Sequence, residues 1–416
     1  MVIGKGSPDG VLSRDDVYDI ASQAFDTGDF DGKRVIVLIP DATRTMPMPL
    51  CFRMFAELLK PRTKRLDFLI ALGTHMEMSE EAINSMLGVT PEERTGPFED
   101  IRIFNHTWDN PAQLTSVGTI TRKEIEEISG GLMSEDVDVT INKLVLDYDI
   151  VLVCGPTFPH EVVGFSGGNK YLFPGIAGPD IINFFHWLGA VITNPVINGS
   201  KYTPVRAVVD RAAQMVGPER RCFSLVVHFS DLRGMYYGTP EEAYAAAADL
   251  SDKVHIVYKD RAYDTVLSQS PVMYDDLWTA AKCFYKLEPV VADGGELIIY
   301  APHVTEVSYT HGKVLDEIGY HTRDYFLAQM AQFKDVPRGV LAHSTHVKGI
   351  GTYDSGVEKP RVRCTLATGI PEERCKRINL GYRDPASINV DEYKDKEDEG
   401  ILYVPKAGEV LHRLKS

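Results

Sequence analysis

The sequence feature that most restricts the fold is an alternation of buried apolar runs with helical segments. Residues 33–40, 65–72 and 147–159 each contain a continuous apolar run that is typical of a buried strand. A helical pattern at 13–25 precedes the first run, and another at 49–59 separates the first from the second. Strands of this kind are covered on both faces, as in parallel sheets flanked by helices. The alternation therefore predicts an α/β fold with parallel or mixed sheets.

The same alternation continues along the chain. A length of 416 residues exceeds what one hydrophobic core usually organises, so two domains are expected. A loop at 265–271, rich in Ser, Gln and Pro, suggests a boundary that gives domains of 1–266 and 267–395, with a tail at 396–416 that returns to the first domain. Further strands are expected at 101–104, 143–146, 221–229, 253–258, 289–300, 338–343 and 400–404, and helices at 179–189, 240–249 and 274–287.

Composition excludes several classes of protein. The net charge of −15 argues against a nucleic-acid or acidic-membrane partner. The amino terminus has no apolar core of a signal peptide, and no run of about 18 apolar residues occurs, so a membrane span is not expected. The six cysteines form no C-x-x-C pair, which favours reduced thiols in a cytoplasmic protein over a disulfide framework.

Polar residues follow three of the predicted strands. Asp41 and Arg44 follow the first, His75 follows the second and His160 follows the third. In open α/β sheets, ligands bind outside the carboxyl ends of the strands. Asp41 alone could be a turn residue and Arg44 a surface charge, but the recurrence at three strand ends favours a site.

The segment after His160 is rich in glycine and contains Lys170. Glycines in 164–170 allow the backbone to approach a ligand closely and can present amide groups to an anion. It is not a nucleotide-triphosphate loop, because the lysine is followed by Tyr171 and not by Ser or Thr. His186 lies near the end of the next predicted helix, where Gly189 is a stop signal. Taken singly, His186 would more often be a half-buried core residue and Lys170 a surface charge.

Together these motifs resemble the nickel-pincer lactate racemase family in order and spacing. The matching residues are Asp41-x-Thr43-Arg44-x-x-Pro47, Gly73-x-His75, and His160-x-x-x-Gly164-Phe165-Ser166-Gly167-Gly168-x-Lys170 followed by His186.

The resemblance implies two α/β domains with the active site in the cleft between them. It also implies an isomerase that inverts C2 of a 2-hydroxy acid by reversible hydride transfer to a nickel-pincer nucleotide, a pyridinium-3,5-bisthiocarboxylic acid mononucleotide that holds nickel. The partners implied are a small-molecule substrate and the enzymes that make the cofactor, and a homo-oligomer is left open. By analogy the site residues are His75 and His160 as acid/base catalysts; Lys170, Asp41, Thr43, Gly167 and Gly168 for the cofactor; Arg44, Lys282 and Trp278 for the substrate; and His186 for nickel.

The chain departs from lactate racemases on the substrate side. Those enzymes carry Tyr-Gln ahead of the lysine that matches Lys282, whereas this chain has Trp278 and Thr279, and no tryptophan follows. We therefore expect a substrate other than lactate, first a sugar acid and second a small or dicarboxylic acid such as malate, with lactate itself as an alternative. Polar residues that could read a hydroxylated acid are His303, Thr305, Tyr309, His311 and His343.

Two other functions compete with this interpretation. A nicotinamide-dependent dehydrogenase fits the sheet, but no G-x-G-x-x-G follows a strand. A non-enzymatic protein that binds a nucleotide or sugar acid could use the glycine-rich segment without redox chemistry.

Overall fold

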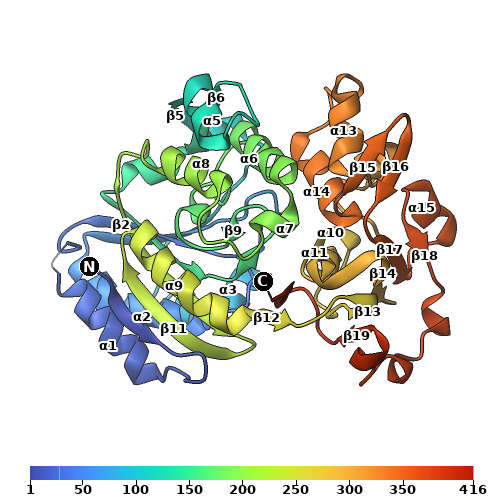
Figure 1. Ribbon diagram of the computed structural model, residues 1–416. Helices are drawn as coiled ribbons and strands as arrows, with labels where there is room; N and C mark the ends of the chain where they lie inside the picture. The colour runs from blue at the N-terminus through green and yellow to red at the C-terminus, as the bar shows by residue number, and fades with distance from the viewer. Residues whose placement is uncertain (28, 416) are drawn as a thin grey trace. The chain divides into compact units, whose positions relative to one another are not determined.

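The computed structural model describes residues 1–27 and 29–415, which form two compact units (Figure 1). Unit 1 comprises Met1–Phe158, Phe165–Ile182 and Pro204–Val254. Unit 2 comprises Pro159–Gly164, Asn183–Thr203 and His255–Ser416. The last stretch of unit 2 begins at His255, whereas the domain boundary was expected at 266, and the assignment of domains and of the tail at 396–416 stays a prediction.

Unit 1 is built on a seven-stranded mixed sheet, in the order β1-β11-β10-β7-β2-β3-β4. The strands from β10 to β4 are parallel, whereas β11 and β1 are antiparallel at one edge. The bounds are β1 (Ile3–Gly6), β2 (Arg34–Ile39), β3 (Arg65–Ile70), β4 (Ile103–Asn105), β7 (Ile150–Pro156), β10 (Glu219–His228) and β11 (Asp231–Gly238).

Helices cover both faces of this sheet, which explains the continuous apolar runs. On one face, α1 (Arg14–Phe25), α2 (Met48–Met54) and the π-helix η1 (Phe55–Leu59) pack on alternate strand residues in one large core. Helix α1 begins with a capping box between Ser13 and Asp16, as its sequence predicts. On the other face, α9 (Pro240–His255) packs on β10.

A smaller antiparallel ribbon of unit 1 corrects one expectation. Residues 143–146 were expected to form a strand, but they lie in the 3₁₀ helix η4 (Lys143–Asp147). The strand is β6 (Val137–Asn142), whose buried and half-buried residues alternate and which pairs with β5 (Leu114–Ile120). The remaining helices of unit 1 are α3 (Glu80–Leu87), α4 (Pro91–Arg94), α5 (Arg122–Ser129) and α8 (Pro204–Ala213).

Unit 2 contains a five-stranded parallel sheet in the order β18-β17-β14-β13-β19. The expected strands at 289–300 and 400–404 are confirmed as β14 (Val291–Ala301) and β19 (Ile401–Val404), the latter at the sheet edge. The loop expected at 265–271 is largely strand β13 (Tyr263–Gln269), and the expected strand at 253–258 is β12 (Ile256–Lys259), which pairs separately with β20 (Leu411–Leu414). The other strands are β17 (Arg363–Thr368) and β18 (Gly381–Tyr382).

Two expectations about secondary structure in unit 2 were wrong. Residues 338–343 were read as a buried strand but begin the buried helix α14 (Arg338–Lys348), which lies between Pro337 and Gly349. A short apolar run does not distinguish the two structures. The helix expected at 274–287 is split into α10 (Leu277–Ala280) and α11 (Lys282–Tyr285). Other elements of unit 2 are β8 (Pro159–His160), α7 (Asn194–Ile197), α12 (Gly312–Ile318), α13 (Arg323–Gln329), α15 (Glu372–Arg377), β15 (Gly351–Asp354) and β16 (Val357–Pro360), together with short 3₁₀ helices.

Helix α6 (Pro179–Ile192) begins in unit 1 and ends in unit 2. Gly189 was expected to end it, but the helix continues for three more residues. A Cβ at Gly189 would lie 3.1 Å from the carbonyl oxygen of Val162, so the glycine allows another segment of unit 2 to pass close to the helix.

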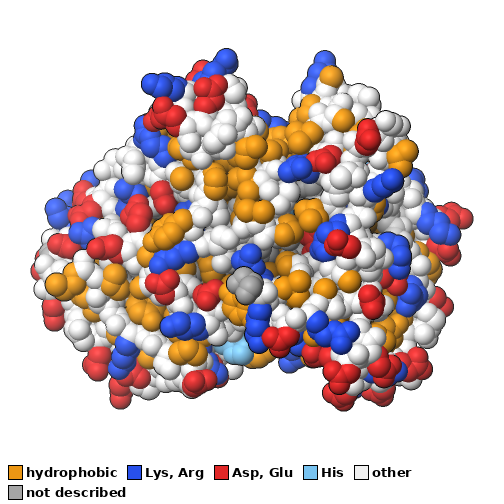
Figure 2. All heavy atoms as spheres, in the orientation of Figure 1, with side chains coloured by type: hydrophobic (Ala, Val, Ile, Leu, Met, Phe, Trp, Pro, Cys, Tyr) orange, Lys and Arg blue, Asp and Glu red, His pale blue; other side chains and the backbone are white. Residues whose placement is uncertain are grey.

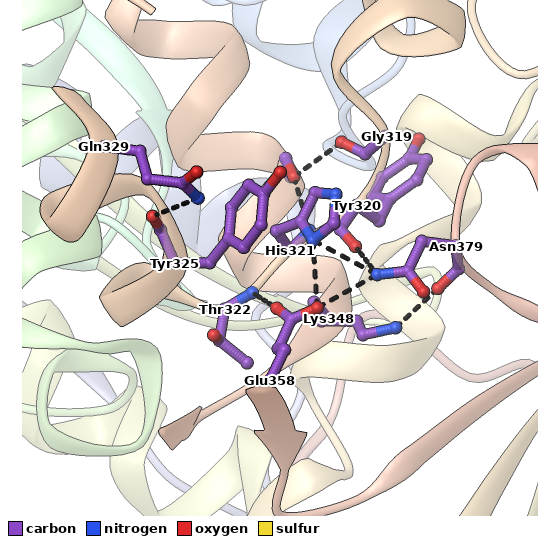
Figure 3. Close-up of polar contacts among 10 residues, drawn as sticks. Gly319, Tyr320, His321, Thr322, Tyr325, Gln329, Lys348, Glu358 and Asn379 are labelled. Atoms are coloured by element: carbon purple, nitrogen blue, oxygen red, sulfur yellow. Dashed lines mark hydrogen bonds and ion pairs between the residues drawn. The ribbon is translucent and has the colours of Figure 1, made fainter. Parts of the chain in front are cut away.

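A buried polar network organises one corner of unit 2 (Figure 3). The Glu358 carboxylate accepts hydrogen bonds from His321 Nδ1 at 2.9 Å, the Thr322 amide at 2.6 Å and Asn379 Nδ2 at 3.0 Å. The His321 ring stacks on Tyr325, with 3.7 Å between centroids. Burial raises the pKa of Glu358, but the bonds from His321 and Thr322 outweigh it and lower the pKa to about 2.

Acidic side chains gather along the lower edge of unit 2 on the face drawn in Figure 2, over the segment that leads into β19. Glu397 of this segment pairs with Lys259 of β12 at 2.9 Å. The exposed acidic residues of this segment are Asp391, Glu392, Asp395, Glu397, Asp398 and Glu399.

None of the helices among residues 1–27 and 29–415 combines the length and apolar character needed to cross a membrane.

Candidate active site

The first part of the site lies at the carboxyl ends of β2 and β3, which are neighbours in the sheet of unit 1. The Asp41 carboxylate accepts a hydrogen bond from His75 Nδ1 at 2.5 Å. Its other oxygen accepts bonds from the hydroxyl and the amide of Thr43, at 2.6 and 3.1 Å. Arg44 donates to the Thr43 hydroxyl at 3.0 Å. The sequence predicted each of these residues but not the bond between Asp41 and His75.

The bond to Asp41 determines the chemistry that His75 can perform. Burial raises the pKa of Asp41, but the hydrogen bond from His75 and the charges of His75 and Arg44 outweigh it, so the pKa lies well below its usual value. An ionised carboxylate only accepts hydrogen bonds, so Nδ1 of His75 carries the hydrogen. In the neutral ring Nε2 is then the acceptor, as a general base requires.

The glycine-rich segment follows β7, the neighbour of β2. Ser166 fixes its start, because its hydroxyl donates to the Pro156 carbonyl at 2.9 Å and accepts from the Phe158 amide at 3.0 Å. Gly167 and Gly168 adopt φ of 89° and 59°, and a Cβ at Gly167 would lie 2.3 Å from the Thr157 hydroxyl. Only glycine fits these two positions. The half-buried Lys170 follows in the 3₁₀ turn η5 (Gly168–Tyr171).

His160 belongs to unit 2 and is held differently from His75. Its Nδ1 accepts a hydrogen bond from the Val162 amide at 3.2 Å, and Glu161 lies 3.4 Å away. Because Nδ1 is the acceptor, the neutral ring carries its hydrogen on Nε2 and can donate it. The buried Lys286 donates to the carbonyl of Pro159, directly before His160. The sequence analysis did not identify Lys286.

His186 lies half-buried on α6, within the part of that helix that belongs to unit 2. Its ring stacks on Phe185, with 4.5 Å between centroids. Within the described ranges, no group of three or more His, Cys, Asp or Glu side chains is arranged to hold a metal ion.

Two of the predicted polar residues of unit 2, His311 and His343, contact Trp278. The His343 ring stacks on its indole at 3.8 Å between centroids, and the His311 ring lies at 4.6 Å. Burial, with the nearby His346, His311 and His186, lowers the pKa of His343 well below its usual value, so this ring is neutral. Lys282 lies over the Tyr274 ring at 4.6 Å.

Two polar atoms beside Trp278 are buried without a hydrogen-bond partner among the described residues. They are His343 Nε2 and the hydroxyl of Tyr320, whose ring lies 5.8 Å from that of His343. Buried polar groups are rarely left without a partner. Of the other predicted polar residues, His303 bonds to the Tyr274 carbonyl and Tyr309 is exposed. The sequence analysis did not identify Tyr320.

Three comparisons show which known proteins this chain resembles. Residues 19–197 match the family model of the lactate racemase N-terminal domain. Lactate racemase of Thermoanaerobacterium thermosaccharolyticum is 23% identical over 279 residues, which cover 65% of this chain and 60% of that protein. The chain thus matches less than two thirds of the length of this curated relative.

Solved structures have the same fold. A crystal structure of a protein from Thermotoga maritima superposes with a TM-score of 0.88 and 31% identity, covering 99% of this chain and all of that one. The lactate racemase apoprotein of T. thermosaccharolyticum superposes with a TM-score of 0.74 and 18% identity, covering 97% of this chain and 95% of that one.

Proposed function

Because the chain belongs to the lactate racemase-like family, we propose that it is an isomerase that inverts C2 of a 2-hydroxy acid. The observation that carries the proposal is the Asp41–His75 pair beside the glycine-rich segment of Lys170, at the ends of the adjacent strands β2, β3 and β7. Oriented imidazoles at the carboxyl edge of a parallel sheet are suited to acid/base work on a small ligand.

The cofactor we propose is a nickel-pincer nucleotide, which when bound supplies nickel and an acceptor for hydride. The donor set of the chain fits such a group, because His186 is a good nickel ligand and the described residues provide no complete set of protein ligands around it. Lys170 would hold the nucleotide covalently, through a thioamide formed between its ε-amine and a thiocarboxylic acid group of the nucleotide with loss of water. Asp41, Thr43, Gly167 and Gly168 would line the cofactor, and the two glycines leave room for its close approach.

The residues of the chain explain how C2 could be inverted. The C2 proton of a 2-hydroxy acid is very weakly acidic next to an ionised carboxylate, so loss of hydride to give a planar 2-keto acid is the easier route. The hydroxyl must lose its proton at the same time. Nε2 of His75 is set to accept that proton from one enantiomer, and His160, whose neutral ring carries its hydrogen on Nε2, would return a proton to the keto oxygen. For the other enantiomer the two rings would exchange these roles. Arg44 could hold the carboxylate with two parallel hydrogen bonds.

The substrate we propose is a hydroxylated acid, first of all a sugar acid. Trp278 would pack against the carbon chain and Lys282 would contact the substrate. His343 Nε2 and the Tyr320 hydroxyl are polar atoms without a partner among the described residues, and a hydroxyl of the substrate would satisfy them. A methyl group, as in lactate, would leave both unsatisfied.

The experiment that tests the proposal uses protein co-expressed with the enzymes that make the cofactor. Intact mass and nickel content are measured for the wild type and for Lys170→Ala. We expect a mass increase of mononucleotide size with about one nickel in the wild type and neither in the variant.

The holoenzyme is then incubated with single enantiomers of gluconate-type acids, malate and lactate, and the epimers are resolved. Turnover of lactate alone would contradict the proposed substrate. Accumulated keto acid with added NAD would favour a dehydrogenase, and ligand binding without nickel or turnover would favour a binding protein.

A further inference from the structure

Arg206 is the largest fully buried side chain among the described residues, and the reaction proposed above gives it no role. It lies on α8 and is 2% exposed. Burying a guanidinium group is costly unless its N–H groups find partners. The identity of those partners therefore indicates what this residue does.

Arg206 binds the backbone of the glycine-rich segment. One terminal nitrogen donates to the carbonyl of Gly167 at 3.1 Å and the other to the carbonyl of Phe165 at 2.5 Å. The ring of Tyr244, on α9, covers the guanidinium at 4.0 Å. A planar group with several N–H donors in a rigid fork can hold two carbonyls in fixed positions, which a lysine cannot do.

The same Gly167 carbonyl is directly connected to Lys170. It accepts a hydrogen bond from the amide of Lys170 at 3.3 Å, and this bond closes the turn that contains Lys170. Since Gly167 also has φ of 89°, its peptide orientation is not the one an ordinary residue would choose. Arg206 therefore stabilises the carbonyl orientation that the turn needs.

A second contact holds the segment from the same helix. Asp210, one turn after Arg206, accepts a hydrogen bond from Asn169 Nδ2 at 2.9 Å, and Glu241 accepts another at 2.7 Å. Arg220 donates to the Asn169 side-chain oxygen at 3.2 Å. Asn169 directly precedes Lys170, so contacts from α8 and from the start of α9 fix the residues on the amino-terminal side of the lysine.

We propose that Arg206 is the positioning residue of Lys170: by clamping the Phe165 and Gly167 carbonyls, it fixes the turn that presents the lysine amine for covalent attachment of the nucleotide. The inference rests on the proposed function for the identity of the nucleotide. The clamp itself stands on contacts within unit 1.

The test compares Arg206→Lys and Arg206→Gln with Arg211→Gln. Arg211 lies on the same helix but pairs with Glu124 at 2.8 Å, so it controls for the loss of a helix charge. The first readout is the rate at which each protein gains the mass of the nickel-pincer nucleotide when supplied with it. The second is hydrogen exchange of the amides of 165–171 in protein without cofactor.

We expect Arg206→Lys to gain the mass at least 10-fold more slowly than the wild type, with at least 10-fold faster exchange confined to 165–171. Arg211→Gln should match the wild type in both readouts. If Arg206→Gln fails to fold, Arg206→Lys decides, because it keeps the buried charge.

Unchanged attachment and unchanged exchange in Arg206→Lys would overturn the positioning role, as would exchange that rises equally across the sheet of unit 1. A wild type that gains no mass would instead contradict the proposed function. Exchange at 165–171 would still report whether Arg206 holds the turn.

Discussion

Nδ1 of His75 donates its hydrogen to the Asp41 carboxylate across 2.5 Å, which leaves Nε2 as the basic atom of that ring. In His160 the arrangement is reversed, because its Nδ1 accepts a hydrogen bond from the Val162 amide. Neutral His75 is thus oriented as a base and neutral His160 as an acid. Inverting either enantiomer needs both roles, a base that takes the hydroxyl proton as hydride leaves and an acid that returns a proton to the keto oxygen as hydride is added.

Replacing Asp41 by Asn should therefore impair catalysis more than folding. The amide nitrogen of Asn can donate to Nδ1 and so favour the tautomer in which Nε2 carries the hydrogen. We expect the epimerisation rate to fall at least about 10-fold, in line with other residues that orient a histidine. Rates and cofactor mass are measured together. The exposed Asp15→Asn serves as control, and an unchanged rate in Asp41→Asn would refute the role of the pair.

Replacing Gly167 by Ala should disrupt the segment that carries Lys170. The new Cβ would lie 2.3 Å from the Thr157 hydroxyl, in addition to the strain of φ at 89°. We expect a loss of about 3 kcal/mol or more in the free energy of unfolding, against about 1 kcal/mol for Gly130→Ala, where φ is 64° but no atom lies within 4 Å. Denaturant unfolding measures both. Adding Thr157→Ala should recover part of the loss, and no recovery would show that the hydroxyl is not the obstacle.

Replacing His343 by Phe should change the choice of substrate. The new ring can still stack on Trp278 but lacks Nε2. We expect kcat/KM for a hydroxylated acid to fall about 10-fold, the effect of one lost hydrogen bond of about 1.4 kcal/mol, with little change for lactate. His303→Phe, at an exposed position, is the matched control. Equal losses of kcat/KM for the hydroxylated acid and for lactate would mean that His343 does not bind a hydroxyl group of the substrate.

Replacing Glu358 by Gln should alter stability in acid. The pKa of Glu358 is lowered from 4.5 to about 2 in the folded protein, so its carboxylate stabilises the fold fully above about pH 4.5 and progressively less as pH falls toward 2. The contribution is on the order of 3 kcal/mol. Thermal unfolding between pH 2.5 and 7 should show a wild-type advantage at neutral pH that shrinks in acid. A constant difference across this range would contradict the assignment.

The strands of unit 1 were predictable because burial on both faces leaves a continuous apolar run. The run at 150–156 and its neighbours show this directly. The strand predicted at 338–343 was wrong because a short apolar run fits a strand and a buried helix equally well. The division of the chain was not predictable, since contacts between distant segments define the two units and no linker composition marks them.

The sequence indicates where the polar residues of the candidate site lie along the chain, but not the bonds between them. Asp41 and His75 follow strands, and Lys170 lies in the glycine-rich segment. Arg206 and Lys286 could not be identified, because each binds backbone carbonyls, and a carbonyl has no signature in a sequence. An arginine amid the apolar residues of α8 was the one available signal. The roles of the site residues, and a site in a cleft between two domains, stay predictions.

Each unit is assembled from three separate stretches of chain, and α6 is shared between the two. On the ribosome, unit 1 therefore cannot close until residue 254 has emerged, after parts of unit 2 have already been made. Strand β12 of unit 2 must wait for its partner β20, at 411–414. Neither unit can be produced as one uninterrupted fragment, so a truncated gene should yield a product that chaperones and proteases recognise as unfinished.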